Sequence, residues 1–139
     1  MSDDFEEADA MVKITFFEPD RIDEELESGR YDTALILTAT TAESIFRDEL
    51  IQYFEIPREA FDEVCDGKTL GWYVSKCNEK EIIDKPYRDS FNKLVRKRAK
   101  LVHDLGYLDQ LSQDGNETEE VHNIIQDCCD WFDSYRRDS

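Results

Sequence analysis

The sequence predicts an all-α protein, an up-and-down bundle of four to five helices. Three observations support this prediction. Apolar residues recur at spacings of three and four over most of the chain. No strand alternation stands out, and prolines and glycines fall between the periodic segments, where they end or begin helices. With 139 residues, the chain is long enough to bury one hydrophobic core, so we expect one helical domain.

The first residues differ from this pattern, because they are acidic and end at Pro19. We expect residues 1–19 to form a flexible arm and residues 20–139 to form the single domain. Within the arm, MVKITFF (residues 11–17) predicts either a short strand or an apolar anchor. The opening MSDDFEEADA lacks the apolar centre of a signal peptide, and no apolar run has membrane-spanning length. We therefore expect a cytoplasmic protein without a membrane partner.

Five helices are expected, over residues 22–54, 57–67, 69–80, 87–105 and 117–136. The first has a potential break at Gly29. Pro57 and Pro86 precede the second and fourth helices, and Gly67 and Gly106 follow them. We expect the segment SQDGNETEE to be a turn-rich loop that leads into the last helix.

Two of these helices carry a clear stripe of residues for the core. The stripe of the first long helix contains Leu35, Ile36, Ala39, Glu43, Phe46, Leu50 and Phe54. The stripe of the last helix contains Val121, Ile124, Ile125, Cys128, Phe132 and Tyr135. The four cysteines lack paired zinc-ligand spacing, so we expect neither a metal site nor a cofactor. Cys128 and Cys129 are expected on a helix as small apolar residues.

The chain is strongly acidic, with a formal net charge of −17. Such a surface normally repels nucleic acids and anionic membranes. Adaptation to high intracellular salt also explains it, because salt screens the repulsion between carboxylates. We favour this halophilic interpretation.

A basic segment interrupts this acidity, because residues 85–100 contain seven basic residues and one acid, a local charge of +6. On a helical wheel, its members Lys93, Arg96, Lys97 and Lys100 share a face directed at solvent. We expect these four residues to bind RNA phosphates. The alternative is electrostatic docking onto the protein's own acidic helices or an acidic partner.

Arg98 has a different environment on the same wheel, in the centre of an apolar cluster. The cluster contains Phe91, Leu94, Leu101, Val102 and Leu105. A buried guanidinium needs a carboxylate or a ligand anion. Glu43, in the centre of the apolar stripe of the first long helix, is the expected partner. The alternative is a structural salt bridge without any function.

His103 follows Arg98 by five residues, in the last turn before Gly106. On an ideal helix the two side chains diverge by about 140°, but both can border a groove at the helix end, particularly across a symmetric dimer. A histidine takes a proton from a hydroxyl near neutral pH, and an arginine stabilises a phosphorane dianion. This pair suits metal-independent RNA cleavage with the 2′-hydroxyl as nucleophile. The alternative is a solvent-facing histidine favoured by the helix dipole.

The segment RAKLVH, Arg98 to His103, resembles the R-x4-6-H motif of the HEPN superfamily of helical, often RNA-cleaving domains. The helix containing YDTALILTATTAESIFRDEL is similar to the early helix of that family, with Glu43 at the place of its inward acidic residue. The order of the helices is also similar, over residues 22–137.

This resemblance implies a homodimer with a composite site at the subunit interface, in a toxin or a defence or stress ribonuclease. His103 would be the general acid or base, Arg98 would stabilise the phosphate and Glu43 would orient Arg98. An antitoxin protein is a further implied partner. Ala99 departs from the family pattern, since a polar residue, typically asparagine, often follows the motif arginine.

Three functions are compatible with the sequence. The first is a metal-independent endoribonuclease, which the basic segment and the Arg98/His103 pair favour. The second, favoured by Ala99, is a catalytically inactive module that binds nucleotide, RNA or a protein partner. The third is a structural dimerisation domain with a buried Glu43–Arg98 pair.

Overall fold

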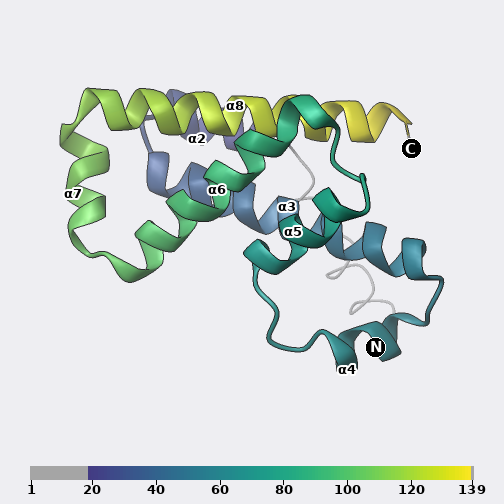
Figure 1. Cartoon of the computed structure of the whole chain (residues 1–139). Helices are drawn as coiled ribbons and strands as arrows, with labels where there is room; N and C mark the ends of the chain where they lie inside the picture. Colours follow the sequence, from purple (N-terminus) through teal and green to yellow (C-terminus); the bar gives the residue numbers. More distant parts are fainter. Residues whose placement is uncertain (1–18, 139) are drawn as a thin grey trace, which may run out of the picture.

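The computed structural model describes residues 19–138 and confirms the all-α class, because this part of the chain forms helices and no strand (Figure 1). The helices are α2 (Pro19–Glu27), α3 (Tyr31–Phe54), α4 (Arg58–Val64), α5 (Leu70–Glu79), α6 (Lys85–His103), α7 (Gly106–Gln113) and α8 (Gly115–Asp138). Most of the expected arm, including MVKITFF, lies outside the described residues.

The predicted break at Gly29 separates α2 from α3. Gly29 has a φ of 75°, a left-handed conformation that favours glycine. Its amide donates to the Leu26 carbonyl at 3.0 Å, and the Arg30 amide donates to the Glu25 carbonyl at 2.9 Å. These bonds satisfy carbonyls at the end of α2. Gly67, also left-handed with a φ of 77°, lies between α4 and α5 as expected.

The prediction of a loop over SQDGNETEE is wrong, because nearly all of this segment belongs to helices α7 and α8. Between them, Asp114 is the one residue outside a helix. Its carboxylate accepts a hydrogen bond from the Asn116 amide at 3.0 Å and contacts the Glu117 amide at 3.4 Å. The turn-forming residues thus cap α8 at its start instead of forming a long loop.

The long helix α3 is central to the bundle, because α2, α5, α6, α7 and α8 all pack against it. Figure 1 shows α8 along the top of the molecule, α6 descending beneath it, and α7 joining the two at the left. Since several helices cover it, α3 also buries Ala34, Ala42 and Ile45, which lie outside its predicted stripe. Ile36 and Phe54, by contrast, belong to the predicted stripe but are exposed.

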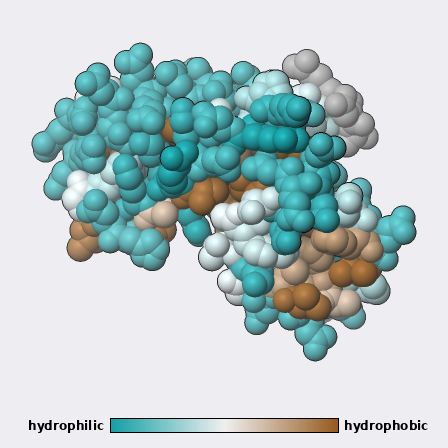
Figure 2. Space-filling model, viewed as in Figure 1, coloured by the Kyte–Doolittle hydropathy of each residue, from teal (hydrophilic) through white to brown (hydrophobic). Residues whose placement is uncertain are grey.

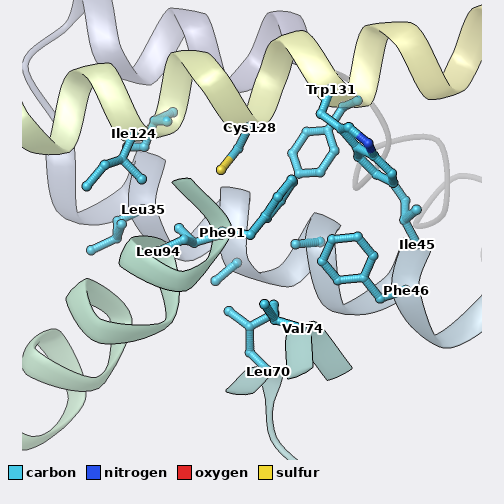
Figure 3. Packing of buried hydrophobic residues seen from close by; sticks show 14 of the residues in the cluster. Leu35, Ile45, Phe46, Leu70, Val74, Phe91, Leu94, Ile124, Cys128 and Trp131 are labelled. Atoms are coloured by element: carbon cyan, nitrogen blue, oxygen red, sulfur yellow. The ribbon is translucent and has the colours of Figure 1, made fainter. Parts of the chain in front are cut away.

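The hydrophobic core lies where α3, α5, α6 and α8 meet. Figure 3 shows Phe46 of α3, Phe91 of α6 and Trp131 of α8 gathered there. The Phe46 and Phe91 rings are 5.0 Å apart, and the Phe91 and Trp131 rings are 5.5 Å apart, both in edge-to-face arrangements. Val74 of α5 and Ile124 of α8 extend the same core on either side.

The four cysteines are free thiols in this core. Cys128 and Cys129 lie on α8 as small buried residues, as predicted. Burial raises the pKa of Cys77 and of Cys129 to about 12, and it raises the pKa of Cys128 well above its ordinary value. The thiols of Cys77, Cys128 and Cys129 therefore remain protonated at neutral pH.

The surface is mostly hydrophilic, with a hydrophobic patch at the lower right, near α4 and the end of α3 (Figure 2). The exposed large hydrophobic residues of that region are Tyr53, Phe54, Ile56 and Val64. A smaller hydrophobic area lies at the lower left, beside α7. Among the described residues, no helix is both long and apolar enough to span a membrane.

Candidate functional site

Helix α6 carries the basic segment and both motif residues. It begins after Asp84, which has extended backbone, and Pro86 lies in its first turn, where the missing N–H costs nothing. Its buried side is formed by Ser90, Phe91, Leu94 and Lys97. Helix α6 packs against α3 and α8, and also against α5 and α7, so only part of its surface is exposed to solvent and ligands.

Lys97 lies in a buried polar cluster, which corrects the prediction that it faces solvent. Its side chain is 8 % exposed, and its Nζ donates to Glu117 at 2.7 Å and to Glu120 at 3.2 Å. The Tyr107 hydroxyl donates to the same Glu117 oxygen at 2.6 Å. One carboxylate thus links α6, α7 and α8. Lys97 cannot serve as a free cation for RNA.

The charges of this cluster stabilise one another. Burial raises the pKa of Glu117, but the hydrogen bonds from Lys97 and Tyr107 outweigh it and leave that pKa below its ordinary value. Burial lowers the pKa of Lys97, and its bonds to the two carboxylates again prevail, so its pKa is raised. Burial and the bond to Glu117 together raise the pKa of the Tyr107 hydroxyl. Lys97 and Glu117 are therefore a charged pair at neutral pH.

Arg98 lies at the boundary between core and solvent, whereas the helical wheel predicted it in the centre of the apolar face. Its side chain is half-buried, and it forms no ion pair or hydrogen bond with the described residues. The buried stripe is rotated towards Lys97, because α8 covers that side of α6 over much of its length. On the side of Arg98, the first turn of α5 lines the space. Within the described part of the chain, no side chain occupies the Arg98 guanidinium.

Arg98 and His103 line one groove of about 150 Å³ between α6 and the start of α5. Its other lining residues are Thr69, Leu70, Gly71, Val95, Ala99 and Val102. Figure 2 shows the surface hollowed between the end of α6 and α5. Gly71 allows α5 to approach α6 closely beside the groove, since a Cβ there would lie 3.3 Å from a Val95 methyl group. The groove combines a guanidinium that no residue of α2 to α8 pairs with, an exposed imidazole and apolar walls.

Glu43 does not lie in this groove, and the predicted Glu43–Arg98 pair is not formed. Glu43 is half-buried and lines a separate hollow with Arg47, Asp62 and Tyr73, among others. In that hollow, Arg47 forms an ion pair with Asp62. The helical wheel placed Glu43 and Arg98 on facing stripes of two helices. In the structure, α5 packs against both α3 and α6 and contributes lining residues to the Glu43 hollow and to the groove, so the two side chains lie at different sites.

A second hollow lies on the opposite flank of α6. Its volume is about 160 Å³, and its lining consists of Lys93, Arg96, Lys97, Lys100 and Glu120. We call it the basic hollow. The predicted RNA-binding residues are thus brought together at one place, with Lys97 buried in its wall. Arg96 and Lys100 are exposed and form no ion pair with described residues, whereas Lys93 pairs with Asp89 at 3.1 Å.

The junction between α6 and α7 exposes apolar side chains, which corrects their assignment to the core. Val102 is 59 % exposed and Leu105 is 88 % exposed. The last turn of α6 projects beyond the helices that cover Phe91 and Leu94, so nothing in the described chain covers these two residues. His103 is exposed between them.

The sequence contained a signal for the buried cluster that wheel analysis of α6 alone missed. Glu117 precedes Val121 by four residues and Ile124 by seven, so it continues the buried stripe of α8. A carboxylate on that stripe requires a cation from a facing helix. Within the described residues, no group of three histidine, cysteine or acidic side chains is arranged to hold a metal ion.

Comparison of the chain with protein-family models, with curated proteins and with solved structures gives no significant match.

Proposed function

We propose that the protein is a metal-independent endoribonuclease that acts in the groove between α5 and α6. The observation that carries this proposal is that Arg98 and His103 line the same groove while Arg98 forms no ion pair within residues 19–138. The resemblance of Arg98–His103 to the HEPN motif supports it. A guanidinium presents a fork of hydrogen-bond donors that matches the oxygens of a phosphate.

In the proposed reaction, the 2′-hydroxyl of the substrate attacks the adjacent phosphorus and forms a 2′,3′-cyclic phosphate. His103 accepts the proton of that hydroxyl, and Arg98 binds the non-bridging oxygens as negative charge develops. The bond from phosphorus to the 5′-oxygen breaks, and this leaving oxygen receives a proton. The products are one RNA fragment with a cyclic phosphate and one with a 5′-hydroxyl.

A second copy of the chain would complete this site. One neutral imidazole accepts the proton of the 2′-hydroxyl, and a second imidazole, present as imidazolium, gives its proton to the leaving oxygen in the same step. The exposed apolar residues Val102 and Leu105 flank His103 and provide a surface for a partner copy. We therefore propose a homodimer whose two α6 ends face each other.

The cleavage experiment uses purified protein and a fluorescent single-stranded RNA in the presence of EDTA. We expect fragments with cyclic phosphate ends, and we expect His103→Ala to reduce the rate by about 10²-fold or more. Arg98→Ala should have an effect of similar size, since it removes the charge that stabilises the transition state. His122→Ala and Arg21→Ala are the matched controls, because neither residue lines the groove.

A rate for His103→Ala equal to that of the unmodified protein would refute catalysis by this residue. EDTA-sensitive cleavage would refute the metal-independent mechanism.

The second candidate function is an RNA-binding module without catalysis. The separation of Glu43 from Arg98 favours it, because the carboxylate expected to orient the guanidinium is in another hollow. In that case the protein binds RNA without cutting it, and Arg98→Ala weakens binding.

A further inference from the structure

The groove and the basic hollow lie on opposite flanks of the C-terminal half of α6. Arg96 and Lys100 belong to the hollow, whereas Arg98 and Ala99 belong to the groove. Since a helix with its side chains is about 10 Å wide, a short stretch of extended polynucleotide can reach from one to the other. The groove and the basic hollow both open to solvent along the exposed side of α6, and a single ridge of side chains on that side separates them.

The ridge is low at its centre. It consists of Arg96, Ala99 and His103, which follow one another at spacings of three and four and are all exposed. Ala99 has no atoms beyond its Cβ, so a strand can pass close to the helix there. Arg96 and His103 provide polar groups on either side of that crossing point.

The basic hollow contains an internal competitor for an incoming anion. Glu120 lines the hollow with a side chain that is 47 % exposed, and it binds Lys97 at 3.2 Å. Glu117 holds the same ammonium more closely, at 2.7 Å, from the buried side. A phosphate in the hollow meets Arg96 and Lys100 but is repelled by the carboxylate of Glu120.

We propose that the basic hollow binds a backbone phosphate of single-stranded RNA, and that the strand then crosses α6 over Ala99 into the Arg98/His103 groove. This inference rests on the proposed function, because it assumes that the groove receives RNA. It adds the path of the substrate and its class. A duplex is too wide and stiff to bend over a ridge about 10 Å across, whereas a single strand is flexible enough.

The experiment measures binding independently of cleavage. The probe is a fluorescein-labelled oligo(2′-O-methyluridine) of about 12 nucleotides, within the usual single-strand site size, and it lacks the 2′-hydroxyl that cleavage requires. Fluorescence anisotropy gives its Kd at several salt concentrations. Two pairs of variants have equal changes of charge. Lys100→Ala is compared with Lys85→Ala, at the far end of α6, and Glu120→Gln is compared with Glu119→Gln, which is exposed and outside the hollow.

We expect Lys100→Ala to weaken binding about fivefold and to reduce the slope of log Kd against log salt by about 0.7. Glu120→Gln should strengthen binding about threefold, because it removes the repulsive carboxylate. The control variants should differ from the unmodified protein by less than about twofold. The same oligonucleotide in a duplex should bind more weakly than the single strand.

Equal effects within each pair would overturn the proposal, since net charge alone would then explain them. Duplex binding as strong as single-strand binding would also overturn it. The two proposals fail separately. If Lys100 and Glu120 affect binding as expected but RNA is not cut, the ribonuclease fails and the path stands. If cleavage depends on Arg98 and His103 but the two variants of each pair have the same Kd, the proposed path fails and the proposed ribonuclease stands.

Discussion

Lys97 connects α6 to α8 through one ammonium group, and its removal leaves two carboxylates without this counter-charge. Its closest partner, Glu117, is 9 % exposed, so water cannot replace the lost interaction without a rearrangement. The exposed pair of Lys93 and Asp89 on the same helix is different, because solvent screens both charges. The two pairs allow a direct comparison of buried and exposed ion pairs in one helix.

We expect Lys97→Met to lower the free energy of unfolding by about 3 kcal/mol, measured by urea unfolding with circular dichroism. Adding Glu117→Met should recover much of this loss, because no unpaired charge then remains buried. The matched control Lys93→Met should cost less than about 0.5 kcal/mol. An effect of Lys97→Met no larger than that of the control would show that the pair contributes no stability.

The pKa shifts give this pair a specific pH dependence. The pKa of Glu117 is lowered from 4.5, so its contribution to stability is present above that value and is lost as the pH falls through the lowered pKa. The pKa of Lys97 is raised from 10.5, so its contribution is present below that value and is lost as the pH rises through the raised pKa. As the pH falls through the lowered pKa of Glu117, the free energy of unfolding should therefore decrease less for Glu117→Gln than for the unmodified protein.

At the scale of helices, the junction of α6 and α7 leaves apolar side chains exposed to solvent. Asp104 accepts a hydrogen bond from the Gly106 amide at 3.0 Å, and Tyr107 anchors the start of α7 in the core. The short connection is therefore held at both sides while Leu105 remains exposed. A fixed, exposed leucine suits an interface better than a mobile one, because less conformational entropy is lost on association.

We expect the protein to elute as a dimer and Leu105→Asp to shift it to the monomer, because two charges would face each other across the two-fold axis. Size-exclusion chromatography with light scattering measures this shift. Val64→Asp is the matched control, since Val64 is 76 % exposed but lies on α4, far along the chain from the junction. A monomer for the unmodified protein would contradict the proposed composite site, as would dissociation by the control alone.

The whole molecule shows how its acidic charge opposes folding. The pKa of Asp23 on α2 is raised by partial burial and by neighbouring acids, above all Asp133 on α8. A carboxyl whose pKa is raised in the folded state takes up protons more readily there, so stability decreases as the pH rises above its ordinary value of 3.8. Ionised Asp23 therefore destabilises the fold at neutral pH, and salt should relieve the repulsion between the acids.

We expect Asp23→Asn to raise the Tm at low ionic strength, and we expect this gain to shrink in about 2 M KCl, where screening is nearly complete. Thermal unfolding followed by circular dichroism measures both values. The control Glu63→Gln makes the same change of charge on α4, away from the acids that surround Asp23. A gain that is independent of salt, or that the control reproduces, would contradict local repulsion as its cause.

The sequence was sufficient for the fold class and for most helix boundaries, because apolar spacing, prolines and glycines act locally. It was insufficient for the orientation of α6. A helical wheel gives the relative directions of side chains, but Lys97 is buried and Arg98 is not because α8 covers one flank of α6. The wheel also counted Val102 and Leu105 as core, since it does not show where neighbouring helices end. The proximity of Arg98 and His103 followed from the sequence, whereas the position of Glu43 depended on how α5 packs.

The reactivity of the buried cysteines reports on local unfolding of the helices that cover them. A protonated thiol in the core reacts with an alkylating reagent only after the surrounding helices separate. Cys77 lies on α5, and Cys128 and Cys129 lie on α8, so their modification reports on two parts of the bundle. The order in which mass is added would thus show which part separates first, without a probe being introduced into the chain.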